Sequence, residues 1–372
     1  MCDDSLKSWA QHRLSTQYPA PFTLSFFAYR RPFKSPLKTS HGLWSERSGL
    51  IVRIAQGDRQ GWGEVAPVPW FGTESFDQAV EYLWALAGAI AAEKLWSIDD
   101  SYPCCQFAIG SALEMLTDDA VQSWAQTFDH SKTCDNSNLL YRFPGASLNP
   151  TQVAGLMPAG AAALEKWRDL YNQGHRTLKW KVTGNCRELE IFEPLLARLP
   201  DDVTLRLDAN GGLGRSLAET WLTRCDLLPP GRVEYFEQPL PPEDFVGLCR
   251  LQDQFETAIA LDESVVTVGQ LREVAAAGWS GVVVVKPAIA GYPQRFFTGD
   301  LSAADLNYLL KQPWLEKFSG VVFSSVFETP IGQWGALKLA ADLGGQSRRA
   351  MGFGTDAWLA PLAGVKLEAV VR

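Results

Sequence analysis

The chain has 372 residues, a formal net charge of −8 and an isoelectric point near 5.2. Hydrophobic residues make up 46% and charged residues 20% of the chain, which is typical of a folded globular protein, and no apolar run approaches the ~18 residues of a membrane span. Because the balance is acidic and no basic stretch occurs, we expect neither a nucleic-acid partner nor a membrane span.

The amino-terminal residues and the cysteines indicate a compartment. Residues 1–14 (MCDDSLKSWAQHRL) mix acidic and basic side chains without an apolar core segment, so a secretory signal is not expected. The seven cysteines lack CxxC spacing and are odd in number, which argues against a disulfide framework and against a zinc site. We therefore expect a cytoplasmic protein with reduced thiols.

The first third of the chain predicts an α+β domain. Residues 22–68 read as short strands with turns, and GDRQG at 57–61 is typical of a hairpin turn. From residue 75 onwards apolar residues recur at spacings of three and four, which predicts helices at 76–95 and 104–125. The polar stretch 130–138 has the composition of a linker, so we expect a first domain over residues 1–135.

The remainder predicts a (β/α) barrel of the TIM type. Eight apolar runs alternate with helical patterns, and we expect strands at 141–148, 176–182, 203–208, 232–237, 257–262, 281–286, 320–325 and 349–354. The interval between the sixth and seventh runs is longer, so its helix is expected to be displaced or accompanied by a loop. We expect the barrel over residues 136–355 and a return of residues 356–372 to the first domain.

Charged residues follow five successive apolar runs. The runs are TLKWK, TLRLDAN, VEYFEQP, AIALDES and GVVVVKP, and the charged residues are Lys179, Lys181, Asp208, Glu237, Asp262 and Lys286. A single Asp after a strand is more often a helix cap or a loop residue. Acids and bases at five consecutive strand ends instead predict an active site, because barrels build their sites at the carboxyl edge of the strands.

The three carboxylates of this set predict a metal site. Asp208, Glu237 and Asp262 supply hard oxygen ligands, and no Cys or His joins them, which favours Mg²⁺, with Mn²⁺ as a substitute, over zinc. Such a cation holds a substrate carboxylate and stabilises the enediolate that forms when the adjacent carbon loses a proton. We therefore expect one metal ion and a small-molecule carboxylate substrate.

Lysine is the candidate base. Side chains alternate along a strand, so Lys179 and Lys181 face the same side and Trp180 faces the other. Repulsion between the two ammonium groups and partial burial predict a lowered pKa for at least one of them, which suits a neutral base. Alternatively one lysine forms a buried ion pair with Asp208 or Glu237. Both interpretations can hold together, with one lysine orienting and the other reacting.

Further candidates lie around the same barrel mouth. Lys286 reaches it from the far side as an acid, a base or an electrostatic partner, or else forms a salt bridge to Asp262 or Glu263. Substrate contacts are expected from Ser324, Ser325 and Gly354, although helix capping is equally open for the serines. The loops at residues 31–42 and 67–75 are rich in Gly, Pro and aromatic residues and are either lids or ordinary surface loops.

The motifs KWK, RLDAN, FEQP, LDES and VVKP, in this order, resemble the enolase superfamily and its muconate-lactonising-enzyme-like branch. Within that branch the segments GEVAPVPWFGTES, LKWKV, RLDANGG, SSVFET and GFGT are most similar to the o-succinylbenzoate synthase family, over most of residues 22–360. The resemblance implies an enolase-like fold, a modified TIM-type barrel with an α+β capping domain. It also implies a carbon–oxygen lyase, a hydro-lyase of menaquinone and phylloquinone biosynthesis.

The resemblance also implies roles for the site residues. Lys181 would remove the proton alpha to the carboxylate and then protonate the departing hydroxyl, with Lys179 tuning it and Lys286 stabilising the anion from the opposite face. Asp208, Glu237 and Asp262 would bind Mg²⁺. The implied reaction is the syn dehydration of 2-succinyl-6-hydroxy-2,4-cyclohexadiene-1-carboxylate to 2-succinylbenzoate.

Two alternatives remain open from the residues. An N-succinylamino acid racemase, or another racemase, epimerase or cycloisomerase of the superfamily, would use Lys181 and Lys286 as bases on opposite faces. A dipeptide epimerase is disfavoured, because Gly354-Thr355-Asp356 stands where that family is expected to place a DxD pair. The alternative from another class is a Schiff-base lyase that uses Lys286 and needs no metal.

Overall fold

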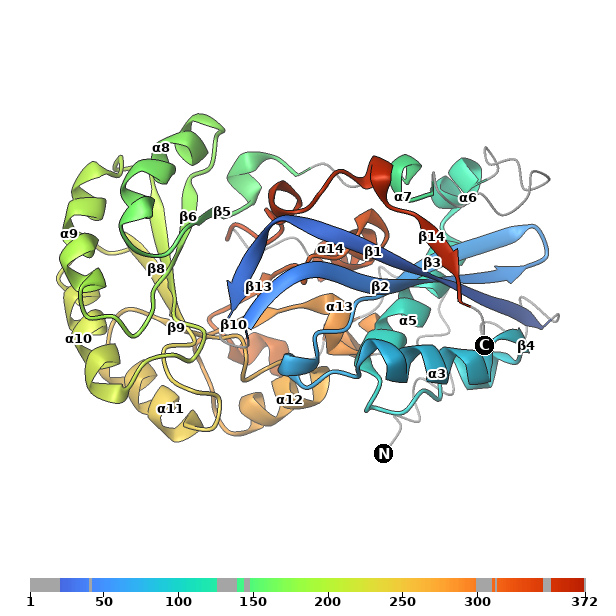
Figure 1. Cartoon of the computed structure of the whole chain (residues 1–372). Helices are drawn as coiled ribbons and strands as arrows, with labels where there is room; N and C mark the ends of the chain where they lie inside the picture. Colours follow the sequence, from blue (N-terminus) through green and yellow to red (C-terminus); the bar gives the residue numbers. More distant parts are fainter. Residues whose placement is uncertain are drawn as a thin grey trace.

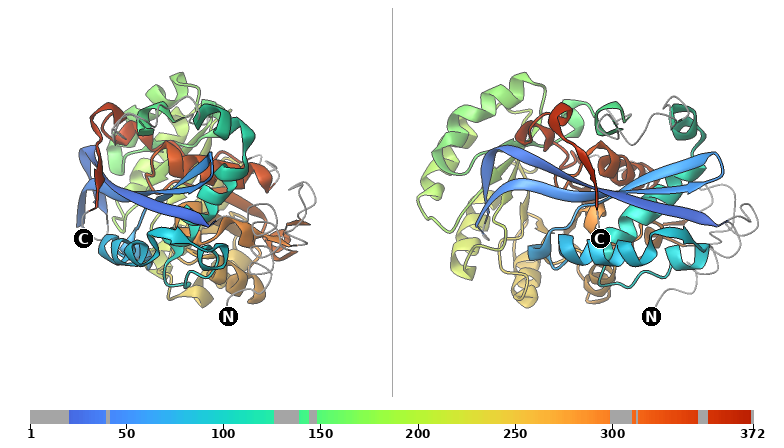
Figure 2. Two further views of the ribbon diagram at one scale, coloured as in Figure 1. Left: turned by 90° about the vertical axis from the view of Figure 1, so that its right-hand side faces the viewer. Right: turned by 45° about the vertical axis from the view of Figure 1, so that its right-hand side comes forward.

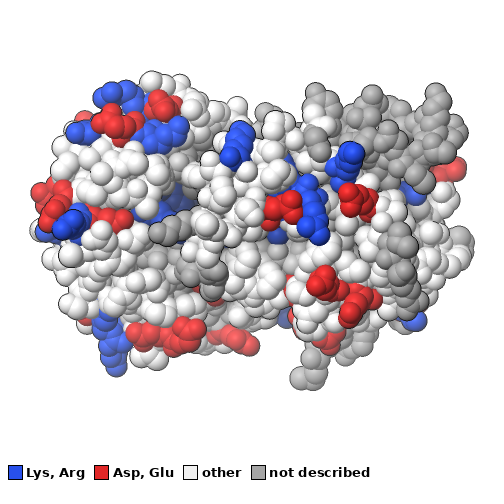
Figure 3. Space-filling model, in the orientation of Figure 1, with Lys and Arg blue, Asp and Glu red and all other residues white. Residues whose placement is uncertain are grey.

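The computed structural model describes residues 21–39, 42–125, 139–143, 148–298, 310–311, 313–343 and 349–370. Two assemblies are visible in Figure 1: long antiparallel strands with their helices, and a curved parallel sheet with helices on its outside. Within these ranges, no helix combines the length and the apolar character of a membrane span. On the face shown in Figure 3, acidic and basic side chains are interspersed in small groups.

The antiparallel sheet forms most of the first assembly. Strands β1 (Phe22–Thr39), β2 (Gly42–Gln56) and β3 (Arg59–Val65) follow one another in the order β14-β1-β2-β3, and β4 (Gly88–Ile90) pairs with the start of β1. The predicted hairpin is confirmed, since Gln56 pairs with Arg59 across a turn in which Gly57 has a φ of 56°. The late strand β14 (Leu367–Ala369) pairs with β1 and stays beside it in both views of Figure 2.

Helices α3 (Phe76–Leu86), α4 (Ala92–Leu95), α5 (Pro103–Thr117) and α6 (Asp119–Ala125) complete this assembly. The backbone of α5 lies directly on β3, where a Cβ at Gly63 would come within 1.8 Å of the Ala108 carbonyl oxygen. Only glycine permits this approach. The single helix expected at 76–95 was wrong: β4 interrupts it, because Gly88 has a φ of 98° and its neighbours pair with β1.

The second assembly is a parallel sheet in the order β13-β10-β9-β8-β7-β6-β5. Its strands are β5 (Gly155–Met157), β6 (Thr177–Lys181), β7 (Thr204–Asp208), β8 (Val233–Glu237), β9 (Ile259–Leu261), β10 (Val282–Val285) and β13 (Gly320–Phe323). Helices α8 (Ala163–Asn172), α9 (Glu188–Arg198), α10 (Arg215–Asp226), α11 (Phe245–Gln254), α12 (Val268–Ala276) and α14 (Pro330–Asp342) alternate with them. The sheet curves into the predicted modified TIM-type barrel (Figure 1).

The eighth predicted strand, at residues 349–354, forms one isolated β-bridge to the chain on each of its two sides. Met351 pairs in parallel with Val153 and Gly352 with Ser324, so this short segment joins β13 to the chain that leads into β5. The predicted first strand at 141–148 was wrong. Residues Leu139–Arg142 form α7, and Leu139, Leu140 and Phe143 are buried against the antiparallel sheet rather than in the barrel. Residues 144–147 lie outside the described residues.

The long interval after the sixth run begins with the short α13 (Pro287–Ala290), which packs against α5. Two short strands follow and pair with each other, β11 (Phe297–Thr298) and β12 (Leu310–Lys311). One 3-10 turn precedes this pair, η6 (Pro293–Phe296), and another follows it, η8 (Pro313–Lys317). The expected displaced helix or accompanying loop stays a prediction, because residues 299–309 and 312 of this interval lie outside the described residues. The expected linker at 130–138, and with it the domain boundary after residue 135, lies outside the described residues.

Apolar side chains fill both faces of the parallel sheet. Inside the ring, Tyr235, Ala260, Val282, Val284 and Val322 form a buried cluster below the mouth. Between the strands and the outer helices, bulky aromatic residues dominate, as in the edge-on contact of Trp180 with Trp221 at 5.9 Å. The barrel interior is therefore a packed core, and polar chemistry is confined to its carboxyl edge.

Candidate active site

The central site residues form one row across three neighbouring strands. In the strand register Lys181 lies opposite Asp208, and Asp208 lies opposite Glu237. Lys179 stands one layer below, on the same face of β6, while Trp180 is fully buried on the other face. Parallel register therefore brings together residues that are far apart in the sequence.

Lys179 bridges two of the three carboxylates. Its ammonium group lies 2.9 Å from Asp208 Oδ2 and 2.7 Å from Glu237 Oε1. Burial alone would lower the pKa of Lys179, but the negative charges of Asp208 and Glu237 outweigh it and raise that pKa well above its usual value. Of the two alternatives for this lysine, the structure contains the buried ion pair, and the expectation of a lowered pKa is wrong for Lys179.

Lys286 and Asp262 form a second pair. Asp262 directly follows β9 and Lys286 directly follows β10, and the ammonium group donates a hydrogen bond to Asp262 Oδ1. The ring of Phe71 covers the same ammonium group, with its centroid 4.5 Å from Lys286 Nζ. Phe71 comes from the antiparallel assembly, within the loop at residues 67–75. That loop therefore reaches the barrel mouth.

Lys181 differs from the other two lysines. Its ammonium group makes no hydrogen bond or ion pair within the described part of the chain, and the residue is partly exposed. Its charge still reaches Asp208: burial raises the pKa of this carboxyl, but Lys179 and, more weakly, Lys181 outweigh the burial and lower it. Among the three lysines at the mouth, Lys181 is thus the one whose ammonium group no described residue holds by a hydrogen bond or an ion pair.

A second layer of residues, which the sequence motifs did not predict, braces the carboxylates. Gln238 is fully buried and accepts the N–H groups of Asp262 at 3.0 Å and Ser264 at 3.3 Å, so it fixes the strand end beside its own. Asn210 donates to Glu263 Oε1 at 3.0 Å in the same way. These residues stand inside the motifs DAN, EQP and DES, and the signal was the amide one or two residues after Asp208 and Glu237.

Backbone strain marks the same edge. Outside glycine, the described residues with positive φ are Asn210 at 45°, Gln238 at 37° and Phe327 at 65°, and all three follow barrel strands at the mouth. Positive φ is costly for residues with a side chain, and such residues cluster at functional sites. The hydrogen bonds of Gln238 and Asn210 hold their two conformations in place.

The three residues expected to contact substrate are placed less uniformly. The Ser325 hydroxyl is buried and engaged internally, 2.8 Å from Glu328 Oε2 and 3.0 Å from Thr355 Oγ1. Ser324 is partly exposed and donates to the Gly352 carbonyl at 3.4 Å. At Gly354 a Cβ would stand 3.1 Å from the Ala154 carbonyl oxygen, so this glycine permits a close approach of two backbones. Ser324 remains the better placed of the serines for a ligand.

The donor set fits a hard divalent cation. Asp208, Glu237 and Asp262 are all buried at adjacent strand ends, and burial together with the neighbouring carboxylates raises the pKa of Glu237. In this structure the ammonium groups of Lys179 and Lys286 take up the carboxylate oxygens, and no trio of acidic, His or Cys side chains in the described ranges is spaced to hold a metal by itself. A bound cation would share these oxygens with the lysines.

Family models match both assemblies. The model described as "MenC, N-terminal domain" matches residues 23–116, and the model described as "Enolase C-terminal domain-like" matches residues 162–294. An o-succinylbenzoate synthase of Thermosynechococcus vestitus is 34% identical over 333 residues, which cover 89% of this chain and 91% of that protein. The chain belongs to the o-succinylbenzoate synthase family.

Two further o-succinylbenzoate synthases show the same relationship. The Yersinia pestis enzyme is 26% identical, with 86% of each chain covered. Among solved structures, the o-succinylbenzoate synthase of Thermosynechococcus elongatus, complexed with Mg in its active site, superposes with a TM-score of 0.72 at 32% identity and covers 90% of this chain and 94% of its own. These named relatives are hydro-lyases of the enolase superfamily.

The wider superfamily shares the fold. The L-Ala-D/L-Glu epimerase of Bacillus subtilis superposes with a TM-score of 0.63 at 22% identity, over 91% of this chain and 90% of its own. Likeness at this level shows the architecture alone. The predicted enolase-like fold, a modified barrel with an α+β capping domain, is confirmed.

Proposed function

We propose that this protein catalyses the Mg²⁺-dependent syn dehydration of 2-succinyl-6-hydroxy-2,4-cyclohexadiene-1-carboxylate to 2-succinylbenzoate. The observation that carries the proposal is the row of Lys181, Asp208 and Glu237 in strand register, with Lys181 as the amine that no described group restrains. An unrestrained lysine beside a cluster of carboxylates suits removal of a proton alpha to a bound carboxylate. Membership of the family supports this reaction over others that use the same fold.

Lys181 would act twice in this reaction. As a neutral amine it takes the proton from the ring carbon that bears the carboxylate, and the electron pair of that C–H bond enters the ring. The resulting ammonium then donates the same proton to the hydroxyl on the neighbouring carbon. The C–O bond breaks, water leaves, and the new double bond completes an aromatic ring. One lysine serves both steps because both groups leave from the same face.

Asp208, Glu237 and Asp262 would hold the metal ion, which when bound supplies a positive charge against the substrate carboxylate and the anion that develops on it. Lys179 would hold Asp208 and Glu237 in place and limit the net charge of the cluster, as its two ion pairs indicate. It lies one layer below Lys181 on the same face of β6. Lys179 is therefore a positioning residue in this proposal.

Lys286 would stabilise the anion electrostatically. Its ammonium group is held by Asp262 and covered by the ring of Phe71. A second base, which an N-succinylamino acid racemase needs, would have to leave the Asp262 pair. A Schiff-base lyase would need the same release before Lys286 could attack a carbonyl group.

One set of assays separates these functions. The purified full-length protein is incubated with the cyclohexadiene precursor and Mg²⁺, and formation of the aromatic product is followed by absorbance, with and without EDTA. We expect metal-dependent conversion. Exchange of the α-hydrogen of N-succinylamino acids with deuterated water tests the racemase, and borohydride trapping at Lys286 tests the lyase. Absence of dehydration, with either of the other two signals present, would overturn the proposal.

A further inference from the structure

Residues 67–72, which we call the mouth segment, lie in the connection between β3 and α3 and carry the ring over Lys286. Turn η2 (Pro69–Phe71) places Phe71 with its centroid 4.5 Å from Lys286 Nζ. Trp70, beside it, packs edge-on against Trp44 at 4.9 Å, and Trp44 in turn packs against Phe327 of the barrel at 5.4 Å. The mouth segment therefore contacts the catalytic edge although it belongs to the capping domain.

A buried carboxylate ties the first end of the mouth segment to the barrel. Glu64 stands three residues before Pro67 and is 0% exposed. It accepts the N–H groups of Thr329 at 2.8 Å and Gly332 at 3.1 Å, the Thr329 hydroxyl and the Tyr29 hydroxyl. Thr329 and Gly332 form the first turn of α14, where a negative charge is favoured. This end is thereby fixed to the helix that follows β13.

A second buried carboxylate ties the other end to α5. Glu74 stands two residues after Gly72 and is 3% exposed. It accepts the N–H groups of Cys104 at 3.2 Å and Cys105 at 2.8 Å, in the first turn of α5. The N-cap residue of this helix, Tyr102, makes no side-chain capping bond, so Glu74 supplies the cap from another element.

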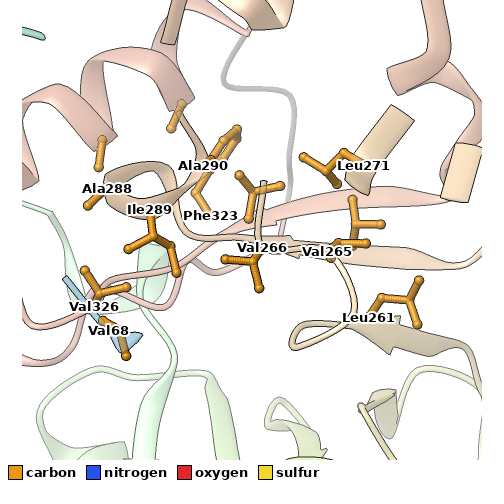
Figure 4. Close-up of a cluster of buried hydrophobic side chains, with 14 of the residues drawn as sticks. Val68, Leu261, Val265, Val266, Leu271, Ala288, Ile289, Ala290, Phe323 and Val326 are labelled. Atoms are coloured by element: carbon orange, nitrogen blue, oxygen red, sulfur yellow. The ribbon is translucent and has the colours of Figure 1, made fainter. Parts of the chain in front are cut away.

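The segment is also closed between its two ends. Arg47 donates to the Pro67 carbonyl at 2.6 Å, and Val68 N–H donates to Thr73 Oγ1 at 2.9 Å, which joins the two sides of the loop. Figure 4 shows the side chain of Val68 beside Val326 of the barrel, within the buried apolar cluster. Hydrogen bonds and apolar packing together leave this segment little freedom to move.

We propose that Glu64 and Glu74 are positioning residues for Lys286, and that they act through the mouth segment by holding Phe71 over the ammonium group. The face of an aromatic ring attracts a cation and excludes water from it, so the position of the ring determines how strongly the ammonium group acts on a bound anion. Because one carboxylate is fixed to α14 and the other to α5, the ring is correctly placed only when both helices hold their ends. This inference rests on the proposed role of Lys286 in dehydration.

The kinetic test uses the full-length protein with Mg²⁺ and the cyclohexadiene precursor. Glu74→Gln keeps the shape of the side chain but turns one acceptor into a donor that faces an N–H group. We expect it to lower kcat about tenfold, with the Mg²⁺ concentration for half-activation unchanged. Phe71→Leu should lower kcat similarly. In the Phe71→Leu background Glu74→Gln should cause no further loss, because its effect passes through the ring.

A matched control is available on the same helix. Glu114 accepts from Gln294 at 2.7 Å and lies nine residues beyond Cys105 on α5, roughly 14 Å along the axis. Glu114→Gln should leave kcat unchanged, whatever it does to stability. If Glu74→Gln lowered kcat equally with and without Phe71, or if Glu114→Gln lowered it as much, the inference would be overturned. Glu64→Gln provides the same comparison for the other end, should Glu74→Gln fail to fold.

A readout that needs no turnover separates this inference from the proposed function. Trinitrobenzenesulfonate labels exposed neutral amines, and the peptide that carries Lys286 is quantified by mass spectrometry. We expect Lys286 to be labelled at least about fivefold faster in Glu74→Gln and Phe71→Leu, with Lys166 on α8 unchanged as the internal control. Equal labelling of Lys286 in all variants would refute the placement of the ring. A wild-type protein without dehydratase activity would instead refute the proposed function, while the labelling would still decide the role of the two glutamates.

Discussion

The ammonium group of Lys179 lies 2.7 Å from Glu237 Oε1, with 18% and 1% of the two side chains exposed. A buried ion pair of this kind gains little net stability, but removal of one partner leaves an uncompensated charge. Glu237 also faces Asp208, which shares the same ammonium group. Lys179 therefore holds the negative charges of Asp208 and Glu237 close together when no metal ion is bound.

Replacement of Lys179 by methionine should destabilise the metal-free protein. The uncompensated carboxylates should cost about 3 kcal/mol of the free energy of unfolding, since both are buried. Mg²⁺ should recover part of this loss, because a cation replaces the missing charge. Urea denaturation in EDTA and in excess Mg²⁺ measures both effects. A Lys179→Met protein as stable as wild type in EDTA would contradict the role of the ion pairs.

Replacement of Lys181 by alanine should abolish turnover and leave the fold intact. Loss of the base should lower kcat by about a thousandfold or more, because no other described amine at the mouth is unrestrained. Mg²⁺ binding, measured by calorimetry, should stay close to that of wild type. An active Lys181→Ala enzyme would assign the base to another residue.

Replacement of Asp208 by asparagine should weaken metal binding selectively. The amide keeps the shape but removes one negative charge from the ligand set, so the dissociation constant for Mg²⁺, measured by calorimetry, should rise at least about tenfold. Lys181→Ala serves as the matched variant, because it removes the base from the neighbouring strand position and should leave that binding unchanged. Unaltered Mg²⁺ binding in Asp208→Asn would remove Asp208 from the metal site.

Glu328 should make the protein less stable as the pH rises. Burial, aided by the nearby charge of Glu64, raises the pKa of Glu328 from 4.5 to about 7. A raised pKa means that the folded state binds a proton that the unfolded state releases between these values. The stabilisation is therefore complete below pH 4.5 and is lost as the pH rises towards 7, by about 3 kcal/mol.

Glu328→Gln tests this dependence, because the amide cannot ionise. The variant should gain stability relative to wild type as the pH rises from 4.5 to 8, with little difference below pH 4.5. Urea unfolding at five pH values measures the difference between the two proteins directly. A constant difference across this range would show that Glu328 keeps an ordinary pKa in the folded protein.

The sequence predicted the strands of the barrel best where buried runs end in a charged residue. The runs before Asp208, Glu237 and Lys286 were placed to within a residue or two, because a buried parallel strand is almost continuously apolar and the following charge marks its end. The apolar run at 141–148 was misassigned, because apolar character alone does not distinguish a barrel strand from a helix buried elsewhere. Gly88 likewise broke a helix that periodicity alone extended.

Residue type and order along the chain determined by themselves that three carboxylates and three lysines would meet at one edge, because parallel strands bring their carboxyl ends together. Only the tertiary structure decided which lysine holds which carboxylate, and that Lys181 stays unrestrained. It alone brought Phe71 and Glu64 to the barrel from a distant part of the chain, and joined Glu74 to the start of α5. Hydrogen bonds and ion pairs depend on tenths of an ångström between side chains, and that precision comes from the packing of two domains rather than from a local pattern of residues.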